Sequence, residues 1–259
     1  MTPTERPFRP CSARPKARAV LALLTLAALV AGGGGRARLA SAQEPVEQIV
    51  IGGVTPRFAV PECVPRTRDE RTEAACRTIT QVLRNDLRFP GLFQFVSDSM
   101  LTAIPPLDPQ APSFEDWQGI GARILVVTQA GLAGDELTVE ARVYFVDSGQ
   151  TMLARRYSGQ ADNPRIFAHQ ASDDIMTLTQ YQGVARTRIA FASDRDSTAE
   201  RSSKELYIVD YDGFNPRRVT VNGSLNILPT WSSDGTSLAY VSYRRGTPLI
   251  YLARIFDVK

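Results

Sequence analysis

Ile189-Ala190-Phe191-Ala192-Ser193 returns later in the chain as Leu238-Ala239-Tyr240-Val241-Ser242, and this repetition decides the fold of the carboxy-terminal part. A second segment, Leu206-Tyr207-Ile208-Val209, returns as Ile250-Tyr251-Leu252-Ala253. The copies are 49 and 44 residues apart, a period that is typical of β-propeller blades built from several short strands. One blade cannot bury both of its faces, and propellers close about four to eight blades into a ring. Residues 189–259 are therefore expected to form the first one to two blades of an incomplete β-propeller.

Two Asp-Gly pairs separate these strands. Asp212-Gly213 follows one repeated strand, and Asp234-Gly235 precedes another. Asp-Gly favours a turn, because glycine accepts positive φ and the aspartate side chain hydrogen-bonds to its own backbone. We interpret both aspartates as turn formers rather than catalytic carboxylates. Trp231 is expected to pack between neighbouring blades, and the strand that begins at Leu238 is expected to be buried on both faces.

The first 42 residues have the pattern of a secretory signal peptide. A basic start precedes an apolar run, Ala19 to Ala31, that is too short to span a bilayer. Ala40-Ser41-Ala42 then offers small residues for cleavage between Ala42 and Gln43. The pattern predicts an exported mature chain that begins at Gln43.

Cleavage changes the charge balance of the chain. Residues 1–42 hold seven of the 30 Lys and Arg residues and one of the 27 Asp and Glu residues, so the formal net charge falls from +3 to about −3. A weakly acidic mature chain has no electrostatic reason to bind nucleic acid or an anionic membrane surface. We expect neither nucleic-acid binding nor direct membrane insertion of the mature chain.

Residues 43–182 are expected to form a separate α/β domain, with a mixed sheet and helices, joined to the propeller by a linker at 183–188. Thr67-Arg68-Asp69-Glu70 has the spacing of a capping box, which predicts a helix with Thr67 as its N-cap. The apolar residues that follow at helical spacing predict its buried face. These residues are Ala75, Ile79, Val82, Leu83 and Leu87.

Other segments of this domain carry clear patterns. Ile124 to Val127 is a continuous apolar run, which predicts a central strand. Leu137 to Asp147 and Thr151 to Ser158 alternate in polarity and predict a hairpin. A short helix is expected from Phe114, with Trp117 facing inward, and a final helix from Ile166 to Leu178. Gln48 to Gly52 is predicted to be the first strand.

Two cysteines, Cys63 and Cys76, follow the predicted cleavage point. An even pair in an oxidising export compartment predicts one disulfide, and free thiols are the alternative. No histidine or third cysteine lies nearby in the sequence, so we do not predict a metal site there.

The sequence has no arrangement that predicts catalysis. Its single histidine, His169, lies four residues before Asp173 on the last predicted helix, where the two side chains can share a hydrogen bond. No Gly-x-Ser-x-Gly places a nucleophile, and the sequence has no P-loop, His-Glu-x-x-His or Cys-x-x-Cys. We therefore expect no enzymatic activity, no cofactor and no metal, and we expect a packing or capping role for His169.

Several segments resemble the TolB family, whose propeller repeats carry Trp-Ser-Pro-Asp-Gly followed by an apolar-Ala-aromatic strand. Residues 231–240 are similar to this core, with Ser233 in place of the proline. The resemblance extends over nearly all of the chain after residue 42. The further similar segments are 86–88, 117–122, 167–174, 183–190 and 207–215.

The resemblance implies a periplasmic, non-enzymatic adaptor of the Tol-Pal envelope system. Such an adaptor links TolA, part of an inner-membrane motor, to the outer-membrane lipoprotein Pal. The system supports outer-membrane constriction during cell division and outer-membrane integrity. Pal docks on the propeller in this family, and most of that surface would lie beyond Lys259, so we expect this chain to bind Pal poorly.

The resemblance also implies where TolA binds. The TolA carboxy-terminal domain engages the mature amino terminus of the family, which corresponds here to Gln43, Glu44, Pro45, Val46, Glu47, Gln48, Ile49, Val50 and Ile51. The last three residues form β-structure readily, and they either add to a sheet edge of the partner or pair within their own domain.

Propellers with these repeats also precede the catalytic domain of prolyl-oligopeptidase-like serine peptidases. In this alternative the chain would be a gating propeller, and the nucleophile would lie in a missing domain. A carbohydrate-binding or signalling propeller is a third alternative. An exported α/β domain before the propeller favours the adaptor over the peptidase, whereas the ligand site of the third alternative would lie in residues outside this sequence.

Overall fold

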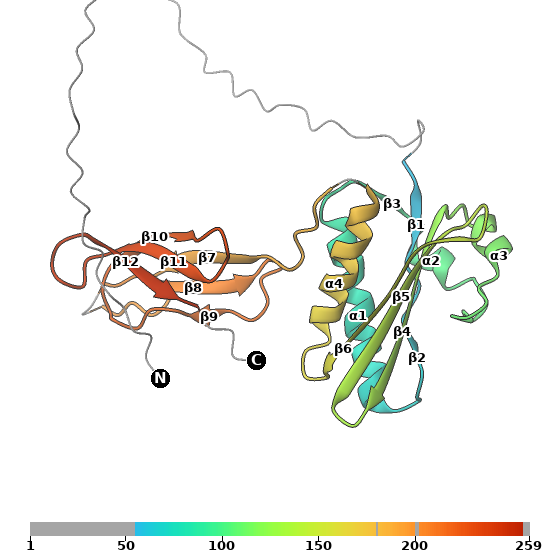
Figure 1. The fold of residues 1–259 in the computed structure, drawn as a ribbon, viewed down its shortest axis with the longest axis horizontal. Coiled ribbons are helices and arrows are strands. Elements are labelled where there is room, and N and C mark those ends of the chain that lie inside the picture. Colours follow the sequence, from blue (N-terminus) through green and yellow to red (C-terminus); the bar gives the residue numbers. More distant parts are fainter. Residues whose placement is uncertain (1–54, 180, 200–201, 256–259) are drawn as a thin grey trace, which may run out of the picture.

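The computed structural model describes residues 55–179, 181–199 and 202–255, which form an α/β part followed by two small sheets (Figure 1). The signal-peptide pattern, its cleavage point at Ala42 and Gln43, the predicted strand at Gln48–Gly52 and the segment Gln43–Ile51 lie outside the described residues. Within the described ranges no helix is both long and apolar enough to cross a membrane.

The α/β part contains β1 (Arg57–Ala59), β2 (Val64–Pro65), α1 (Glu70–Arg88), β3 (Gln94–Phe95), α2 (Asp98–Leu101), α3 (Phe114–Gly119), β4 (Ile124–Ala133), β5 (Glu136–Phe145), β6 (Gln150–Gln160), α4 (Arg165–Met176) and a 3-10 turn at Thr177–Thr179. The strand order is β3-β1-β4-β5-β6, and β2 also pairs with β4. The pairs of β4 with β1 and β2 are parallel, whereas β4-β5 and β5-β6 are antiparallel. The prediction of a mixed sheet with a central strand at Ile124 is therefore confirmed.

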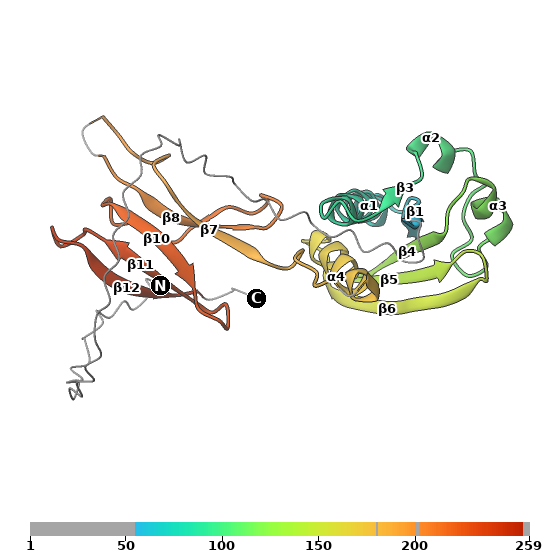
Figure 2. The same cartoon turned by 90° about the horizontal axis from the view of Figure 1, so that it is seen from above.

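Two apolar layers lie on opposite faces of this sheet. Helices α1 and α4 cover one face (Figure 2), where Leu83 and Ile175 have no exposed surface. Trp117 of α3 packs on the other face with Leu125 of β4 and Tyr144 of β5. Trp117 is 2% exposed, so its predicted inward orientation is correct.

Helix α1 buries the face that the apolar spacing predicts, but it begins later than the capping box indicates. The N-cap is Asp69, whose carboxylate accepts the backbone N–H of Thr72 at 2.9 Å. Thr67 instead donates its hydroxyl to Asp69 at 2.6 Å, and that hydrogen bond leads the causes that lower the pKa of Asp69 to about 2. An ionised carboxylate is a stronger acceptor for helix N–H groups than a hydroxyl, so the predicted N-cap at Thr67 was wrong by two residues.

The carboxy-terminal part consists of two three-stranded antiparallel sheets. The first contains β7 (Arg188–Ser193), β8 (Glu205–Asp210) and β9 (Arg217–Arg218), and the second contains β10 (Asn226–Trp231), β11 (Ser237–Ser242) and β12 (Leu249–Arg254). The repeated segments become β7 and β11, then β8 and β12. The two sheets do not close into a ring among the described residues, as an incomplete propeller requires.

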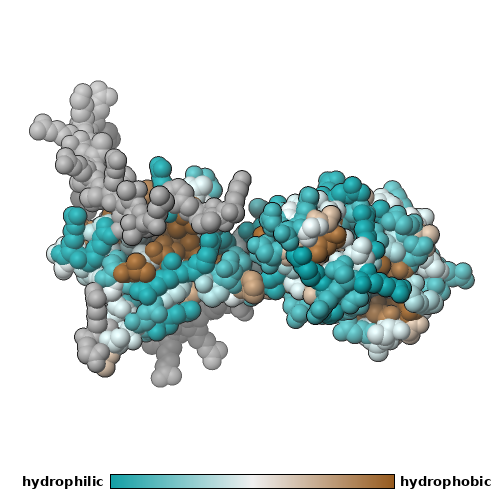
Figure 3. Space-filling model, turned by 90° about the horizontal axis from the view of Figure 1, so that it is seen from below, coloured by the Kyte–Doolittle hydropathy of each residue, from teal (hydrophilic) through white to brown (hydrophobic). Residues whose placement is uncertain are grey.

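The two sheets pack through one face each. Leu206 of the first sheet joins Tyr240, Tyr251 and Ala253 of the second in one buried cluster. Along β11 the residues Leu238, Tyr240 and Ser242 are buried while the residues between them are only half-buried, so the prediction of burial on both faces was wrong. The outer face of the second sheet exposes Ile250 and Leu252, and Figure 3 shows hydrophobic surface on this lobe.

Cys63 and Cys76 form a disulfide, with their Cα atoms 5.0 Å apart, between the segment before β2 and the first half of α1. Both residues are buried, and the backbone N–H of Cys63 donates to the Thr80 hydroxyl at 2.9 Å. The bond thus ties the start of the domain to the helix that carries much of its core.

We expect the double substitution Cys63→Ala and Cys76→Ala to lower the free energy of unfolding of the α/β part by about 3 kcal/mol, because a cross-link over a loop of this size restricts the unfolded chain. Urea unfolding of both proteins, each with and without a reductant, measures the effect. Reductant should destabilise the unsubstituted protein and leave the variant unchanged. If the unsubstituted protein unfolds at the same urea concentration with and without reductant, these residues are free thiols.

Candidate functional site at the domain junction

Three segments that are distant in the sequence meet between the α/β part and the first propeller sheet. They are the carboxy-terminal end of α1, the middle of α4 and the turn that follows β8. The linker after residue 181 also passes through this junction, where it contacts α4. Each segment contributes polar side chains that hydrogen-bond or pair with those of another segment, so the junction is a polar site shared by the two parts.

Asp86 is the centre of the site. Its carboxylate accepts the Tyr211 hydroxyl on one oxygen and lies 2.7 Å from His169 Nδ1 with the other. The ring of Tyr211 makes edge contacts with Phe89 and His169, with ring centroids 5.5 Å and 5.6 Å apart. Burial, followed by the hydrogen bond to Asp86, raises the pKa of Tyr211 above its ordinary value, so its hydroxyl remains a donor.

Asp212 does more than form the predicted turn. One carboxylate oxygen accepts the N–H of Phe214 at 3.1 Å, as in a local turn, and Gly213 has a φ of 85°. The other oxygen pairs with the guanidinium of Arg165 and lies 3.5 Å from His169 Nε2. Arg165 also lies over the Phe214 ring, 4.3 Å from its centroid. The turn is therefore fastened to α4 by an ion pair and a cation–π contact.

Asp173 holds the linker. Its carboxylate accepts the N–H of Ala185 at 2.8 Å and Nε of Arg186 at 2.8 Å. The linker passes so close to α4 that a Cβ at Gly183 would lie 2.6 Å from the Asp173 backbone. The spacing allows a hydrogen bond between His169 and Asp173, but each side chain instead has a partner from another segment.

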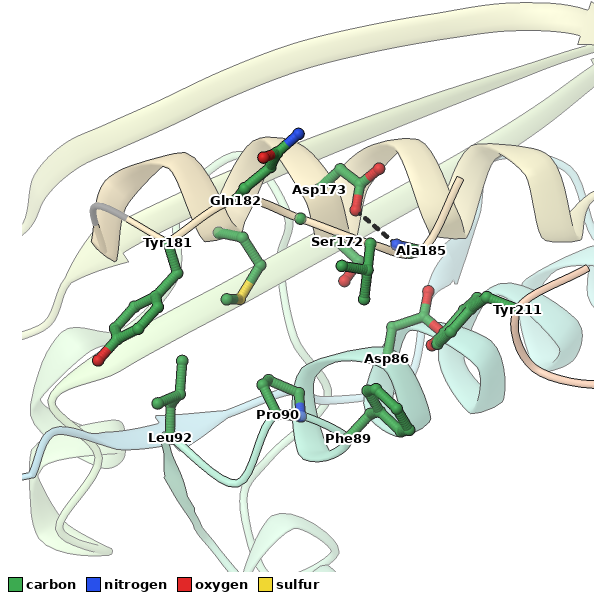
Figure 4. A pocket seen from close by; sticks show the side chains of 13 residues that line it. Asp86, Phe89, Pro90, Leu92, Ser172, Asp173, Tyr181, Gln182, Ala185 and Tyr211 are labelled. Carbon is green, nitrogen blue, oxygen red and sulfur yellow. Dashed lines mark hydrogen bonds between the residues drawn. The ribbon is translucent and has the colours of Figure 1, made fainter. Parts of the chain in front are cut away.

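A cavity of about 220 Å³ opens beside this cluster. In Figure 4 the side chains of Asp86 and Tyr211 point toward each other at one end of the cavity, and the hydrogen bond between Asp173 and Ala185 lies above them on the α4 side. The lining is mostly apolar. Its apolar members are Phe89, Pro90, Leu92, Met176, Val184 and Ala185. A cavity of this character suits apolar side chains of a peptide rather than a polar substrate.

The other predicted scaffold residues lie away from the junction. The turn at Asp234-Gly235 connects β10 with β11, and hydrogen bonds led by the Ser232 hydroxyl lower the pKa of Asp234 to about 2. Trp231 ends β10, and the Arg188 guanidinium of β7 lies 5.1 Å from its ring centroid. This contact joins the first sheet to the second.

The junction has no arrangement for nucleophilic catalysis. The hydrogen-bond and ion-pair partners of the His169 imidazole are carboxylates, and no serine or cysteine is among those partners. Across the described ranges, no group of three or more His, Cys, Asp or Glu side chains is placed to hold a metal ion. Shape and charge favour a role in holding segments together.

The structure thus defines a protein with an α/β domain fastened to the first sheets of a propeller. A family model for the TolB amino-terminal domain matches residues 48–152, and a model for the TolB beta propeller domain matches residues 175–257. The chain belongs to the TolB family.

Named relatives agree with this assignment. The Tol-Pal system protein TolB of Roseobacter denitrificans is 32% identical over 93% of this chain and 53% of its own length. The protein of the same name from Geobacter sulfurreducens is 36% identical over 67% of this chain and 40% of its own length. The crystal structure of TolB from Acinetobacter baumannii superposes with a TM-score of 0.64 at 26% identity, covering 78% of this chain and 47% of that one. The chain spans about half the length of the curated relatives it matches.

Proposed function

We propose that this protein is a periplasmic adaptor of the Tol-Pal system, which links TolA to the lipoprotein Pal without catalysing a reaction. The main support for this proposal is that two TolB family models match consecutive parts of the chain, first the α/β domain and then the propeller. Through these partners it would support outer-membrane constriction during cell division and outer-membrane integrity.

The TolA-binding segment in this proposal is Gln43 to Ile51. Glu44-Pro45 gives it a polar start, and Ile49-Val50-Ile51 gives it an apolar, β-branched end. An extended segment of this kind can add a strand to the sheet edge of a partner, using backbone hydrogen bonds for affinity and alternate side chains for specificity.

The Pal-binding part of the proposal concerns the propeller. The described residues after the linker form two three-stranded sheets, and the outer face of the second exposes Ile250 and Leu252. A docking surface shared among several blades would be incomplete on two sheets. We therefore propose that the chain as given binds Pal weakly.

Serine peptidase gating, the alternative function, has weaker support. Its propeller repeats are similar, but the α/β part of this chain matches the TolB amino-terminal model. No observation on the described residues favours a peptidase partner domain over the adaptor.

Two titrations test the adaptor proposal. The carboxy-terminal domain of TolA and the periplasmic domain of Pal, both from the source organism, are added separately to the chain from Gln43 to Lys259 in a calorimeter. We expect saturable TolA binding and little or no heat with Pal at the same concentrations. Absence of TolA binding would overturn the adaptor proposal, and tight Pal binding would overturn its account of the propeller surface.

A further inference from the structure

The chain has one histidine, and its imidazole lies between two carboxylates from different parts of the molecule. Nδ1 of His169 is 2.7 Å from Oδ2 of Asp86 in α1, and Nε2 is 3.5 Å from Oδ2 of Asp212 in the turn after β8. The side chains of Asp86, His169 and Asp212 are 1%, 8% and 17% exposed. Charge interactions at this depth are screened less by salt than those on the surface.

The protonation state of the ring decides how many of these contacts are favourable. A neutral imidazole has one N–H and one lone pair, whereas the imidazolium has two N–H donors. A neutral ring that donates from Nδ1 to Asp86 therefore directs the lone pair of Nε2 toward Asp212. Nε2 has no hydrogen-bond partner at its present distance. The charged ring attracts both carboxylates.

We propose that His169 is a protonation-dependent latch between the α/β domain and the first propeller sheet, and that it closes the junction more tightly as the pH falls from about 8 to about 5.5. Histidine is the side chain that ordinarily changes charge in this range. The latch requires only the residues of this chain, so it does not depend on the identity of any partner.

The other charged groups around the ring determine how strongly protonation of His169 tightens the junction. Arg165 of α4 already pairs with Asp212, whereas no Lys or Arg pairs with Asp86 in the part of the chain that the structure describes. Asp86 therefore gains most from the imidazolium. The carboxylate of Asp173 pairs with Arg186 of the linker rather than with the imidazole. Tyr211 donates to Asp86, and burial raises the pKa of the neighbouring Asp210, with the Asp212 charge as a further cause.

A polar cleft of about 670 Å³ borders the same ring from the linker side. Its remaining charged lining residues are Asp162, Arg186, Arg188, Asp210 and Arg217. Arginine side chains stay charged in this range, and histidine is the residue type that ordinarily changes charge there. Asp210, whose pKa burial raises, is the carboxyl of this cleft that is shifted toward the same range.

The test measures junction closure in the chain from Gln43 onward. The NMR signals of the single imidazole locate its charge change without assignment ambiguity. Hydrogen exchange of the linker peptide, corrected for the intrinsic pH dependence of exchange, measures closure between pH 5.5 and 8. We expect linker protection to rise about fivefold toward pH 5.5, the upper range for a partly exposed ion pair, in step with the imidazole titration.

Three variants distinguish a pH-dependent latch from a general change in the stability of the protein. His169→Gln should abolish the pH dependence of linker protection. Asp212→Asn retains the turn and should reduce that dependence. Tyr157→Phe removes a similar phenol–carboxylate bond, 2.9 Å to Asp174, that lies wholly within the α/β domain, and it should behave as the unsubstituted protein.

A flat protection profile while the imidazole titrates would overturn the proposal, as would a pH dependence that survives in His169→Gln. If His169→Gln does not fold, Asp212→Asn decides between the outcomes. An unchanged pH dependence in that variant also contradicts the latch.

Discussion

Glu205→Ala is expected to lower the free energy of unfolding of the propeller sheets by about 3 to 5 kcal/mol, the cost of breaking a buried charged network. The Glu205 side chain is fully buried. Its carboxylate accepts the Gly223 N–H at 2.5 Å and the Asn226 side-chain amide at 3.2 Å, and it pairs with Arg218 at 3.1 Å. The Thr220 hydroxyl also donates to it.

The size of this effect follows from the position of the network. Glu205 begins β8 of the first sheet, and Asn226 begins β10 of the second. The carboxylate therefore binds residues of the segment that connects the two sheets, and through Asn226 it also joins the first sheet to the second. An alanine leaves several buried donors without an acceptor, whereas Glu205→Gln keeps acceptor oxygen and should cost less.

The measurement uses the two tryptophans of the chain, one in each part. In a Trp117→Phe background, Trp231 fluorescence during urea unfolding follows the propeller sheets alone. Glu205→Ala should shift this transition to lower urea, and Glu136→Ala, at an exposed glutamate of β5, should not shift it. An unchanged Trp231 transition in Glu205→Ala would show that the network contributes little to stability.

Regular periodicity allowed much of this fold to be predicted. The helical spacing identified the buried face of α1, and the repeat identified β7, β8, β11 and β12. Strand β10 was missed because Pro229, a bulge between Ile227 and Thr230, and a φ of 56° at Leu228 interrupt its alternation. Tertiary contacts stabilise this strand where the local pattern does not indicate one.

The junction was harder to predict, because its side chains come from three separate segments. The sequence analysis singled out His169 and Asp212, but no local pattern shows that they meet across 43 positions of the chain. Nor does one show that Asp86 of α1 contacts His169 of α4. One signal was available. Asp86 falls on the apolar stripe of α1 with Ile79 and Leu83, and a carboxylate on a buried face requires partners.

Removing the amino-terminal segment is expected to have the largest functional effect. If Gln43 to Ile51 adds a strand to TolA, about four backbone hydrogen bonds of about 1 kcal/mol each are lost with it. That loss corresponds to roughly a thousandfold decrease in affinity. Ile49→Asp should weaken binding through the apolar end of the segment, while Glu47→Gln serves as a matched control.

The most direct test of the adaptor account is therefore a titration of the TolA carboxy-terminal domain into two proteins, one that begins at Gln43 and one that begins at Gly52. Circular dichroism first establishes that both fold alike. The account predicts saturable binding by the longer protein and no measurable binding by the shorter one. Equal affinity of the two proteins, or no binding by either, would contradict it.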